Sequence, residues 1–457
     1  MLPERGLGPW HLEPDVTSPG ESRSGGSVRK PLFVNAFVRK WVAVGTAVLL
    51  APLLSTVAST GGAGASTSGL TASAPGITPK TIKIGLITSV TGNASSTFFN
   101  SGQGAQARFD LQNARGGVDG RKLQLIVVDD QSTPGGDLTA AQELVSAKGV
   151  FAVIQYSPYG FGSYRYLQQQ GVPVTGSAFD GPEWGQQPNT NMFSIGGGVD
   201  PHNPANTETG VFFKSLGVKN VAGLAYGISP SSIASIKDLK ESVEHEGMTM
   251  GYENLSVPFG GVDFTADVLQ MKSAGVDAAV CSCVQSSNIA LIVAAKQAGL
   301  HLKAELSLSG ADSSLFDSPT STAAAQGAYF GTTIVPIDLH RAPTNTFVAA
   351  MRKYVPGYTG GYPSFGLTGA YLSADLMIKG LEVAGKNPTR ASFIKNLTKV
   401  KNYNAGGLLP NTVGFNHFGK ANPVLCGYIT RVVGTQFVTI NHGKPFCGKL
   451  IPNSDVS

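Results

Sequence analysis

Short apolar runs alternate with helical repeats along the first part of the chain. Ile82–Thr88 and Leu123–Asp129 are rich in apolar and β-branched residues, which is typical of buried strands. Between them, Gly102–Arg115 carries small and apolar residues at helical spacing. The alternation continues with expected helices over Leu138–Lys148 and Tyr164–Gln170 and strands over Val150–Gln155 and Val172–Thr175. This strand–helix order predicts an α/β fold with a parallel sheet covered on both faces.

A second alternating series begins near Asp200. Its expected helices are Thr207–Leu216, Ser231–Glu246, Phe264–Ala274 and Ile289–Ala298. Its expected strands are Asn220–Tyr226, Thr249–Ser256, Ala278–Cys283 and Glu305–Ser309. The two series indicate two copies of one architecture, although the residues themselves show no repeat.

The order changes beyond Ala323. Ala328–Val335 is interpreted as a strand that crosses between the two lobes. Helices are expected over Thr346–Tyr354, Leu367–Ala384 and Ala391–Thr398, followed by a hairpin of Tyr428–Val432 and Gln436–Ile440. The tail is therefore expected to contribute to both lobes.

The N-terminal region has the parts of a targeting signal. Arg39 and Lys40 precede the uncharged stretch Trp41–Ala58, and a segment rich in Ser, Thr, Gly and Ala follows. A basic flank, an apolar stretch and a small-residue exit are typical of a secretory signal. The stretch is also near the minimum length of a membrane span, so a retained anchor is the alternative. We expect a cleaved signal and an extracytoplasmic protein, at the cell surface, secreted or periplasmic.

Composition narrows the class of partner. The 457 residues suit two lobes of roughly 150–200 residues each. Charged residues make up only 14%, and the net charge is +5 without a strong Lys/Arg run. A nucleic-acid partner is therefore not expected.

The four cysteines fit an exported protein with few bridges. Cys426 and Cys447 flank the expected hairpin and are predicted to form a disulfide. Cys281 and Cys283 share one face of a strand, and their spacing is poor for a bridge. We interpret these two as small buried residues at a strand end.

Catalytic signatures are weak. The sequence contains no Gly-x-Ser-x-Gly, His-Glu-x-x-His or phosphate-loop motif, and its seven histidines are scattered. Asp129-Asp130 follows a strand directly, where a carboxylate usually caps the next loop. Gly102-x-Gly104 lies too far beyond Thr88 to be a dinucleotide turn. We expect neither an enzyme nor a cofactor or metal.

The loops after the predicted parallel strands are the candidate ligand site, because open α/β sheets bind ligands there. These loops concentrate aromatic and hydroxyl side chains, among them Phe98, Phe99, Tyr156, Tyr159, Phe161, Trp184, Ser177, Ser229 and Ser231, with Tyr226 at its strand end. Aromatic faces with a few hydroxyls suit a small organic ligand.

IKIGLITSVTG at Ile82–Gly92 and GAQARFDLQNARGGVDGRKLQLIVVDDQSTP at Gly104–Pro134 carry a family resemblance. They resemble the opening of the leucine/isoleucine/valine-binding proteins, the type I periplasmic-type solute receptors of ABC transporters. AAQELVSAKGVFAVIQYSPY, GVPVTGSAFD and YPSFGLTGAYLSADLMIKGLEVAG resemble later parts of the same family. The resemblance implies two Rossmann-like lobes joined by three crossovers, a ligand bound between them, ABC permease subunits as partners, and a monomer without enzymatic activity.

Site residues follow from the resemblance. Ser157 matches the loop that binds a ligand carboxylate, and Ala178 and Phe179 match a second ligand loop. Ser229 to Ser231 lie where the family often has an aromatic, and Gln285 or Ser286 where amino-acid binders hold an acidic residue. With the loop aromatics, the expected ligand-binding set is Phe98, Phe99, Ser157, Tyr159, Ala178, Phe179, Tyr226, Ser229, Ser231, Gln285 and Ser286.

The expected ligand is small and partly apolar, an acid or an amide, because no carboxylate is evident near Gln285 to pair with a buried ammonium. A branched-chain amino acid is the family default, and Asp180 or Asp312 are possible partners for it. The expected division is a leader over 1–65, a linker over 66–80, lobe I over 81–199 plus 327–405, lobe II over 200–326 plus 406–450, and a tail over 451–457. Crossovers are expected near Gly196–Pro201, Gly327–Val335 and Tyr403–Leu409. A membrane-anchored sensing ectodomain and, less favoured, an enzyme are the alternatives to an ABC receptor.

Overall fold

The computed structural model describes residues 69–178, 181–184, 189–196, 204–416 and 425–456. These residues belong to one compact unit that spans Thr67–Ser457. The expected leader and the apolar stretch Trp41–Ala58 lie outside the described residues. Among the described helices, none combines the length and the apolar character that a membrane crossing needs.

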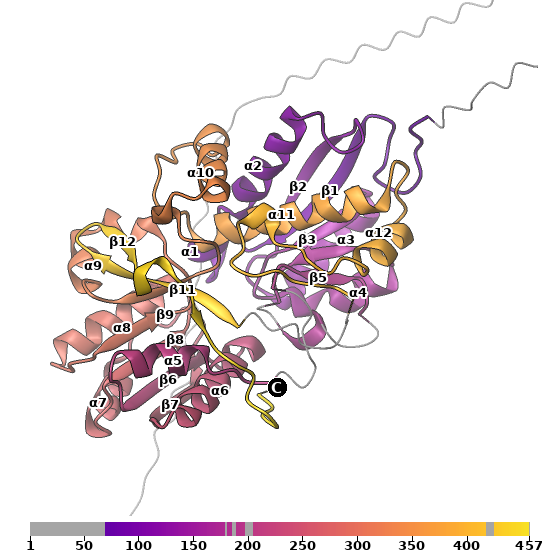
Figure 1. The fold of residues 1–457 in the computed structure, drawn as a ribbon. Helices are drawn as coiled ribbons and strands as arrows, with labels where there is room; N and C mark the ends of the chain where they lie inside the picture. The colour runs from indigo at the N-terminus through magenta and orange to yellow at the C-terminus, as the bar shows by residue number, and fades with distance from the viewer. Residues whose placement is uncertain (1–68, 179–180, 185–188, 197–203, 417–424, 457) are drawn as a thin grey trace, which may run out of the picture. The chain divides into compact units, whose positions relative to one another are not determined.

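The first sheet has the strand order β2-β1-β3-β4-β5, and all its pairings are parallel (Figure 1). The strands are β1 (Thr81–Thr88), β2 (Lys122–Asp129), β3 (Ala152–Gln155), β4 (Val174–Gly176) and β5 (Met192–Ser194). Ile84 and Leu86 of β1 face one core, and Ile87 faces the other. The sheet is therefore buried on both faces, as the continuous apolar runs predicted.

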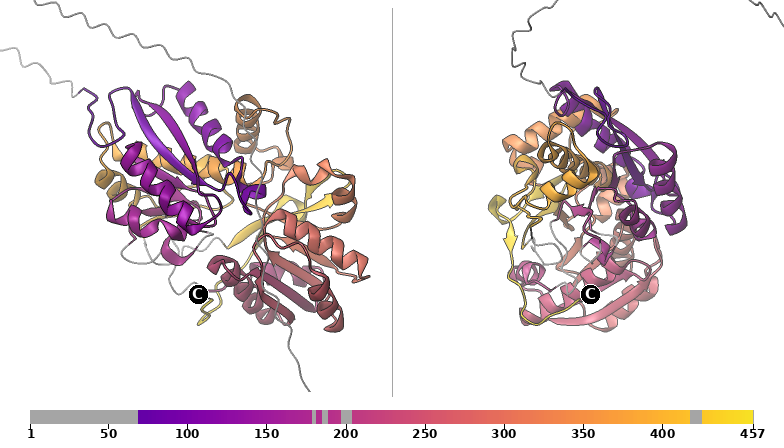
Figure 2. Two further views of the ribbon diagram at one scale, coloured as in Figure 1. Left: turned by 180° about the vertical axis from the view of Figure 1, so that it is seen from behind. Right: turned by 90° about the vertical axis from the view of Figure 1, so that its right-hand side faces the viewer.

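Helices from distant parts of the chain cover this sheet. One face carries α2 (Ser101–Ala114), α11 (Phe365–Ala384) and α12 (Arg390–Leu397), and the other carries α3 (Pro134–Gln142) and α4 (Tyr164–Gln169). A short helix, α1 (Ser95–Phe98), precedes α2, and a π-helical turn over Glu143–Ala147 continues α3. Figure 2 shows the orange helices of the tail packed among the indigo and magenta elements.

Gly104 explains why α2 and α11 lie so close together. A Cβ at this position would lie 2.1 Å from the carbonyl oxygen of Leu367 in α11. Gly104 therefore serves the packing of α2 against α11, whereas a Cβ at Gly102 would meet Val127 of β2.

The second sheet has the order β12-β11-β10-β9-β8-β6-β7. Its parallel strands are β6 (Asn220–Tyr226), β7 (Thr249–Val257), β8 (Ala278–Ser282), β9 (Ala304–Ser307) and β10 (Tyr329–Thr332). The antiparallel strands β11 (Cys426–Val433) and β12 (Gln436–Thr439) complete it, and the short β13 (Phe446–Cys447) pairs with β11. The late hairpin thus joins the second lobe (Figure 2).

Helices also cover both faces of this sheet. Apolar side chains of α5 (Glu208–Ser215) and α6 (Pro230–His245) fill one core. Those of α7 (Thr265–Ser273) and α8 (Gln285–Gln297) fill the other. The remaining helices are α9 (Pro319–Ala324), which contacts α8, and α10 (Ala342–Tyr354), which contacts α2.

The expected elements of both series are present, and the differences have local causes. The third helix begins at Pro134 rather than Leu138, because the Thr133 hydroxyl accepts the Gly136 N–H and Pro134 fits the first turn. β5 was not expected from the sequence. β10 lies within the second sheet, whereas the expected boundary assigned residues 327–335 to lobe I.

Two segments that connect the sheets meet beyond β10. The Val335 N–H donates to the Leu408 carbonyl at 2.8 Å, and Tyr403 exchanges backbone hydrogen bonds with Val413. The expected crossover near Gly196–Pro201 lies largely outside the described residues.

Candidate functional site

A cavity of about 410 Å³ lies where the strand ends of the two sheets face each other. The first-sheet side and its tail helix contribute Thr97, Phe98, Tyr156, Pro158, Ser177, Ala178, Ile195 and Phe365. The second-sheet side contributes Tyr226, Ser229, Ser231, Ser232, Ser235, Phe259, Ser282, Cys283, Val284, Leu308 and Ser309, with Thr333 after β10. The cavity is therefore built from the carboxyl ends of parallel strands, as the sequence predicted.

Three aromatic rings form the wall on the first-sheet side. The centroid of the Phe98 ring lies 5.8 Å from those of Tyr156 and Phe365, and the last two are 5.7 Å apart. The Tyr156 hydroxyl donates to the Phe365 carbonyl at 3.2 Å. This hydrogen bond occupies the polar end of Tyr156 and leaves an apolar surface to meet a ligand.

Gly369 of α11 makes room for that wall. A Cβ at Gly369 would lie 1.6 Å from the Tyr156 hydroxyl oxygen. The position of Tyr156 in the cavity therefore depends on a helix that lies far downstream in the sequence.

The second-sheet side is organised around Tyr226. Its ring centroid lies 4.6 Å from that of Phe259. Its hydroxyl accepts the Val284 N–H at 3.0 Å and shares a hydrogen bond of 2.7 Å with Ser287. Burial raises the pKa of Tyr226 above its usual value, so the phenol is neutral at physiological pH.

Hydroxyl groups gather at the start of α6. Ser229 caps the helix by accepting the Ser232 N–H, and Ser231 shares a hydrogen bond of 3.2 Å with Ser229. The start of this 16-residue helix also carries partial positive charge. This end of the cavity favours an acceptor or an anionic group of a ligand.

None of the described residues that line the cavity is charged. Asp312, one of the acids considered for an ammonium, instead caps a short 3₁₀ helix by accepting the Ser314 N–H at 2.9 Å. Asp180 and Phe179 lie outside the described residues. The described lining thus offers no carboxylate for a ligand ammonium.

Ser157 is buried and is not among the residues that line the cavity. Its hydroxyl donates to the Asp130 carboxylate and accepts the Tyr159 N–H at 3.0 Å. Ser89 also donates to Asp130, at 2.7 Å. Burial raises the pKa of Asp130 despite these hydrogen bonds. Ser157 therefore holds loops of the first sheet together, and its expected contact with a ligand carboxylate stays a prediction.

The adjacent Asp129 also has a structural role. Its carboxylate accepts the N–H groups of Val90, Thr91 and Gln131. Burial alone would raise the pKa of Asp129, but the hydrogen bonds from Thr91, Gln131 and Val90 lower it overall. Neither acid lines the cavity, and both cap loops.

Of the expected ligand-binding set, five residues lie on the cavity: Phe98, Ala178, Tyr226, Ser229 and Ser231. Phe99 is 56% exposed. Tyr159 lies behind the lining, with its ring 5.7 Å from Phe259 and its hydroxyl bonded to Asn93. Gln285 and Ser286 begin α8 outside the lining.

Several lining residues were absent from the expected set. Tyr156 and Ser177 stand in loops that the sequence had singled out. Phe259, Leu308, Thr333 and Phe365 come from segments whose sequence carries no ligand signal. These residues reach the cavity only because the crossovers bring distant parts of the chain to it.

The structure pairs all four cysteines. Cys426 and Cys447 lie opposite each other on β11 and β13, as the sequence predicted, with their sulfur atoms bonded. Cys281 and Cys283 are also bonded to each other, which the interpretation as two separate buried residues did not foresee. Cys283 lines the cavity.

A second cavity, of about 540 Å³, lies beside α10 and β12. Its Asp338 accepts hydrogen bonds from Tyr362 and Thr439 and is thus engaged in packing. None of the described residues that line this larger cavity belongs to the carboxyl end of a parallel strand, so the smaller cavity is the stronger candidate for the ligand site.

Comparison with known proteins agrees with this architecture. The periplasmic binding protein family model matches residues 81–436. No curated protein matches the chain by sequence.

Solved structures share the fold. A fatty acid ABC transporter substrate-binding protein from Thermomonospora curvata is 20% identical with a TM-score of 0.70, covering 86% of this chain and 98% of that one. A valine-bound branched-chain amino acid ABC transporter protein from Thermus thermophilus is 18% identical with a TM-score of 0.66, covering 80% and 97%. A benzoate-bound solute-binding protein from R. palustris is 15% identical with a TM-score of 0.65, covering 82% and 99%. The family model matches most of this chain, and both sheets have the two-lobe arrangement of the similar solved structures. The chain therefore belongs to the periplasmic binding protein family.

Proposed function

We propose that this protein is an extracytoplasmic receptor that binds a small, partly apolar acid or amide and delivers it to an ABC importer. The observation that carries the proposal is the cavity at the facing strand ends, whose described lining is aromatic and hydroxyl-bearing but uncharged. Rings supply apolar contact, and the start of α6 supplies donors for a carboxylate or carbonyl oxygen.

The lining argues against an amino acid clamped at both ends. A buried ammonium without a carboxylate partner is costly, and the described lining contains none. The similar solved structures are a fatty acid ABC transporter substrate-binding protein, a branched-chain amino acid ABC transporter protein with bound valine and a solute-binding protein in complex with benzoate. These compounds define the chemical range within which the ligand is sought.

A thermal-shift panel tests the ligand class. It compares leucine and valine with benzoate, phenylacetamide and straight-chain fatty acids. We expect an apolar acid or amide to raise Tm, and strong stabilisation by leucine or valine alone would overturn the proposed class.

A matched pair of variants locates binding. Phe98 is buried on the cavity wall, whereas its neighbour Phe99 is 56% exposed and off the lining. Phe98→Leu should weaken binding of the stabilising compound, and Phe99→Leu should leave it unchanged. Equal effects of both changes would place the ligand elsewhere.

Delivery to an importer needs a cellular test. Loss of uptake of the stabilising compound on deletion of the gene, and recovery with the intact chain, supports the ABC receptor. Mass spectrometry of the mature protein separates the alternatives, because a retained Trp41–Ala58 favours an anchored sensing ectodomain. Turnover of the compound that is lost in Asp129→Asn would favour an enzyme.

A further inference from the structure

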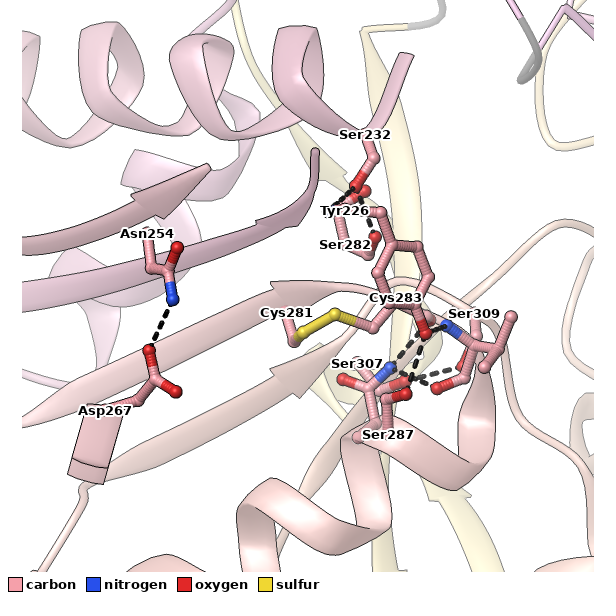
Figure 3. The surroundings of a disulfide bond; sticks show 12 residues. Tyr226, Ser232, Asn254, Asp267, Cys281, Ser282, Cys283, Ser287, Ser307 and Ser309 are labelled. Carbon is pink, nitrogen blue, oxygen red and sulfur yellow. Dashed lines mark hydrogen bonds between the residues drawn. A yellow bond between two sulfur atoms is a disulfide. The ribbon is translucent and has the colours of Figure 1, made fainter. Parts of the chain in front are cut away.

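The cavity wall contains a disulfide between residues only two positions apart. Cys281 belongs to β8 and is 1% exposed, and Cys283 follows the strand and lines the cavity. Ser282, Cys283 and Val284 are three consecutive residues of the lining. One end of the bridge, Cys283, therefore belongs to the candidate ligand site, and Figure 3 shows the residues around the bridge.

The bridge coincides with a bend in the chain. The Cα atoms of Cys281 and Cys283 are 5.1 Å apart. Two residues of an extended strand advance about 6.6 Å. The covalent link therefore holds the chain in the bend where β8 ends and the cavity begins.

Hydrogen bonds tie the bent segment to two residues of the site, Ser232 and Tyr226, and to Asn288 of α8. The Ser232 hydroxyl at the start of α6 donates to the Ser282 carbonyl at 2.6 Å and accepts the Tyr226 N–H at 2.9 Å. Asn288 donates to the Cys283 carbonyl at 2.8 Å, and the Val284 N–H donates to the Tyr226 hydroxyl. Figure 3 shows Tyr226 and Ser232 beside the bridge. A shift of this segment would thus reach both Tyr226 and the hydroxyls of α6.

Stability alone does not account for the link. A disulfide stabilises mainly by restricting the unfolded chain, and the gain grows with the loop that it closes. The sequence separation is 2 for Cys281–Cys283 but 21 for Cys426–Cys447. The short bridge should therefore stabilise the fold less than the long one, yet it is the bridge that lies at the cavity.

We propose that the Cys281–Cys283 disulfide positions the ligand-binding wall and makes binding sensitive to reductant. Reduction by a dithiol breaks the S–S bond, delivers two electrons and two protons to give two thiols, and converts the dithiol to its cyclic disulfide. The bend at β8 then loses its covalent restraint, and Val284, Tyr226 and Ser232 lose their fixed spacing. The binding half of this proposal rests on the proposed receptor function.

The second bridge provides a matched control. In the Cys426→Ser, Cys447→Ser variant the Cys281–Cys283 disulfide is the sole one, so titration with dithiothreitol reports on that bond alone. In the Cys281→Ser, Cys283→Ser variant this bond is absent under both oxidising and reducing conditions. Either protein tests the proposal should the other fail to fold.

Two readouts decide the outcome. Hydrogen exchange at the Val284 amide should become at least about tenfold faster when the Cys281–Cys283 bond is reduced or removed, because the protection of this amide depends on its hydrogen bond to Tyr226. Affinity for a fluorescent fatty-acid analogue, 11-(dansylamino)undecanoic acid, should fall about tenfold, equivalent to one or two lost polar contacts. The Cys426→Ser, Cys447→Ser variant under oxidising conditions should keep both values.

The possible failures are distinguishable. Unchanged Val284 exchange after reduction overturns the proposal. Faster exchange with unchanged binding of the probe overturns the positioning role. Absence of probe binding in both redox forms counts against the proposed ligand class, and the exchange measurement then decides alone whether the bridge holds the wall.

Discussion

Gly369→Ala should destabilise the protein although it replaces a glycine within a helix. Alanine normally stabilises a helix interior by about 1 kcal/mol over glycine. Here the added Cβ would lie 1.6 Å from the Tyr156 hydroxyl oxygen and 2.0 Å from its Cζ. The ring must move by about 2 Å to restore ordinary contact distances.

The magnitude follows from three contributions. Overpacking of a core costs about 1–3 kcal/mol. Losing the hydrogen bond from Tyr156 to the Phe365 carbonyl costs about 1 kcal/mol more. After the helix gain is subtracted, the expected loss in the free energy of unfolding is about 2 kcal/mol. Because Tyr156 lines the cavity, affinity for the stabilising compound should fall as well.

Urea unfolding followed by far-UV circular dichroism measures the change. Gly135→Ala is the matched control, because Gly135 lies in α3 and a methyl group added there would meet no atom within 4 Å. This control should stabilise the protein by about 0.5 kcal/mol. A Gly369→Ala protein as stable as the wild type, with unchanged affinity, would refute the placement of Tyr156 against α11.

Three further predictions concern stability. Cys426→Ser with Cys447→Ser should lower the free energy of unfolding by about 3 kcal/mol, as expected for a disulfide that joins residues 21 positions apart. Non-reducing peptide mapping that finds both wild-type thiols free would contradict this prediction. Burial raises the pKa of Asp137 to about 8, so the native state keeps a proton that the unfolded chain releases near pH 4, and stability should fall as the pH rises between these values. Asp137→Asn should make that slope shallower in urea melts at pH 5 to 8, and an unchanged slope would contradict this prediction. Arg121 is fully buried and donates hydrogen bonds to the carbonyls of Thr78, Thr71 and Lys386. Arg121→Met should therefore lower the free energy of unfolding by about 2–4 kcal/mol in the same urea assay. The same change at the exposed Arg115 should lower it little.

The sequence predicted the fold well because burial leaves a strong pattern. β1 and β6 are buried on both faces, so they appear as continuous apolar runs, and β6 was predicted at its observed bounds of Asn220–Tyr226. Helix starts were harder to predict. The start of α3 depends on the Thr133 cap, a polar contact that lies outside the hydrophobic period.

The candidate site was predictable only in part. Phe98 belongs to the short helix after β1, Tyr226 ends β6 and Ser229 follows it, and the topology alone brings such strand ends to one edge. Thr333, which follows β10, and Phe365, which begins α11 in the tail, line the same cavity. Their position depends on long-range packing, such as that of α11 against α2 through Gly104, which one sequence does not display.

The uncharged lining also explains why the sequence does not identify the ligand. A charged clamp would leave a readable mark, because a buried ion needs a partner of opposite charge. In this protein the two acids at the end of β2 hold loops in place: Asp129 accepts backbone N–H groups, and Asp130 accepts the hydroxyls of Ser89 and Ser157. In the proposed receptor, recognition depends on the shape left between Phe98, Tyr156, Tyr226 and Phe259, and on donors at the start of α6. Small shifts of these groups change which compound fits, so the wall that the Cys281–Cys283 bridge holds in place is where selectivity should be most sensitive to substitution.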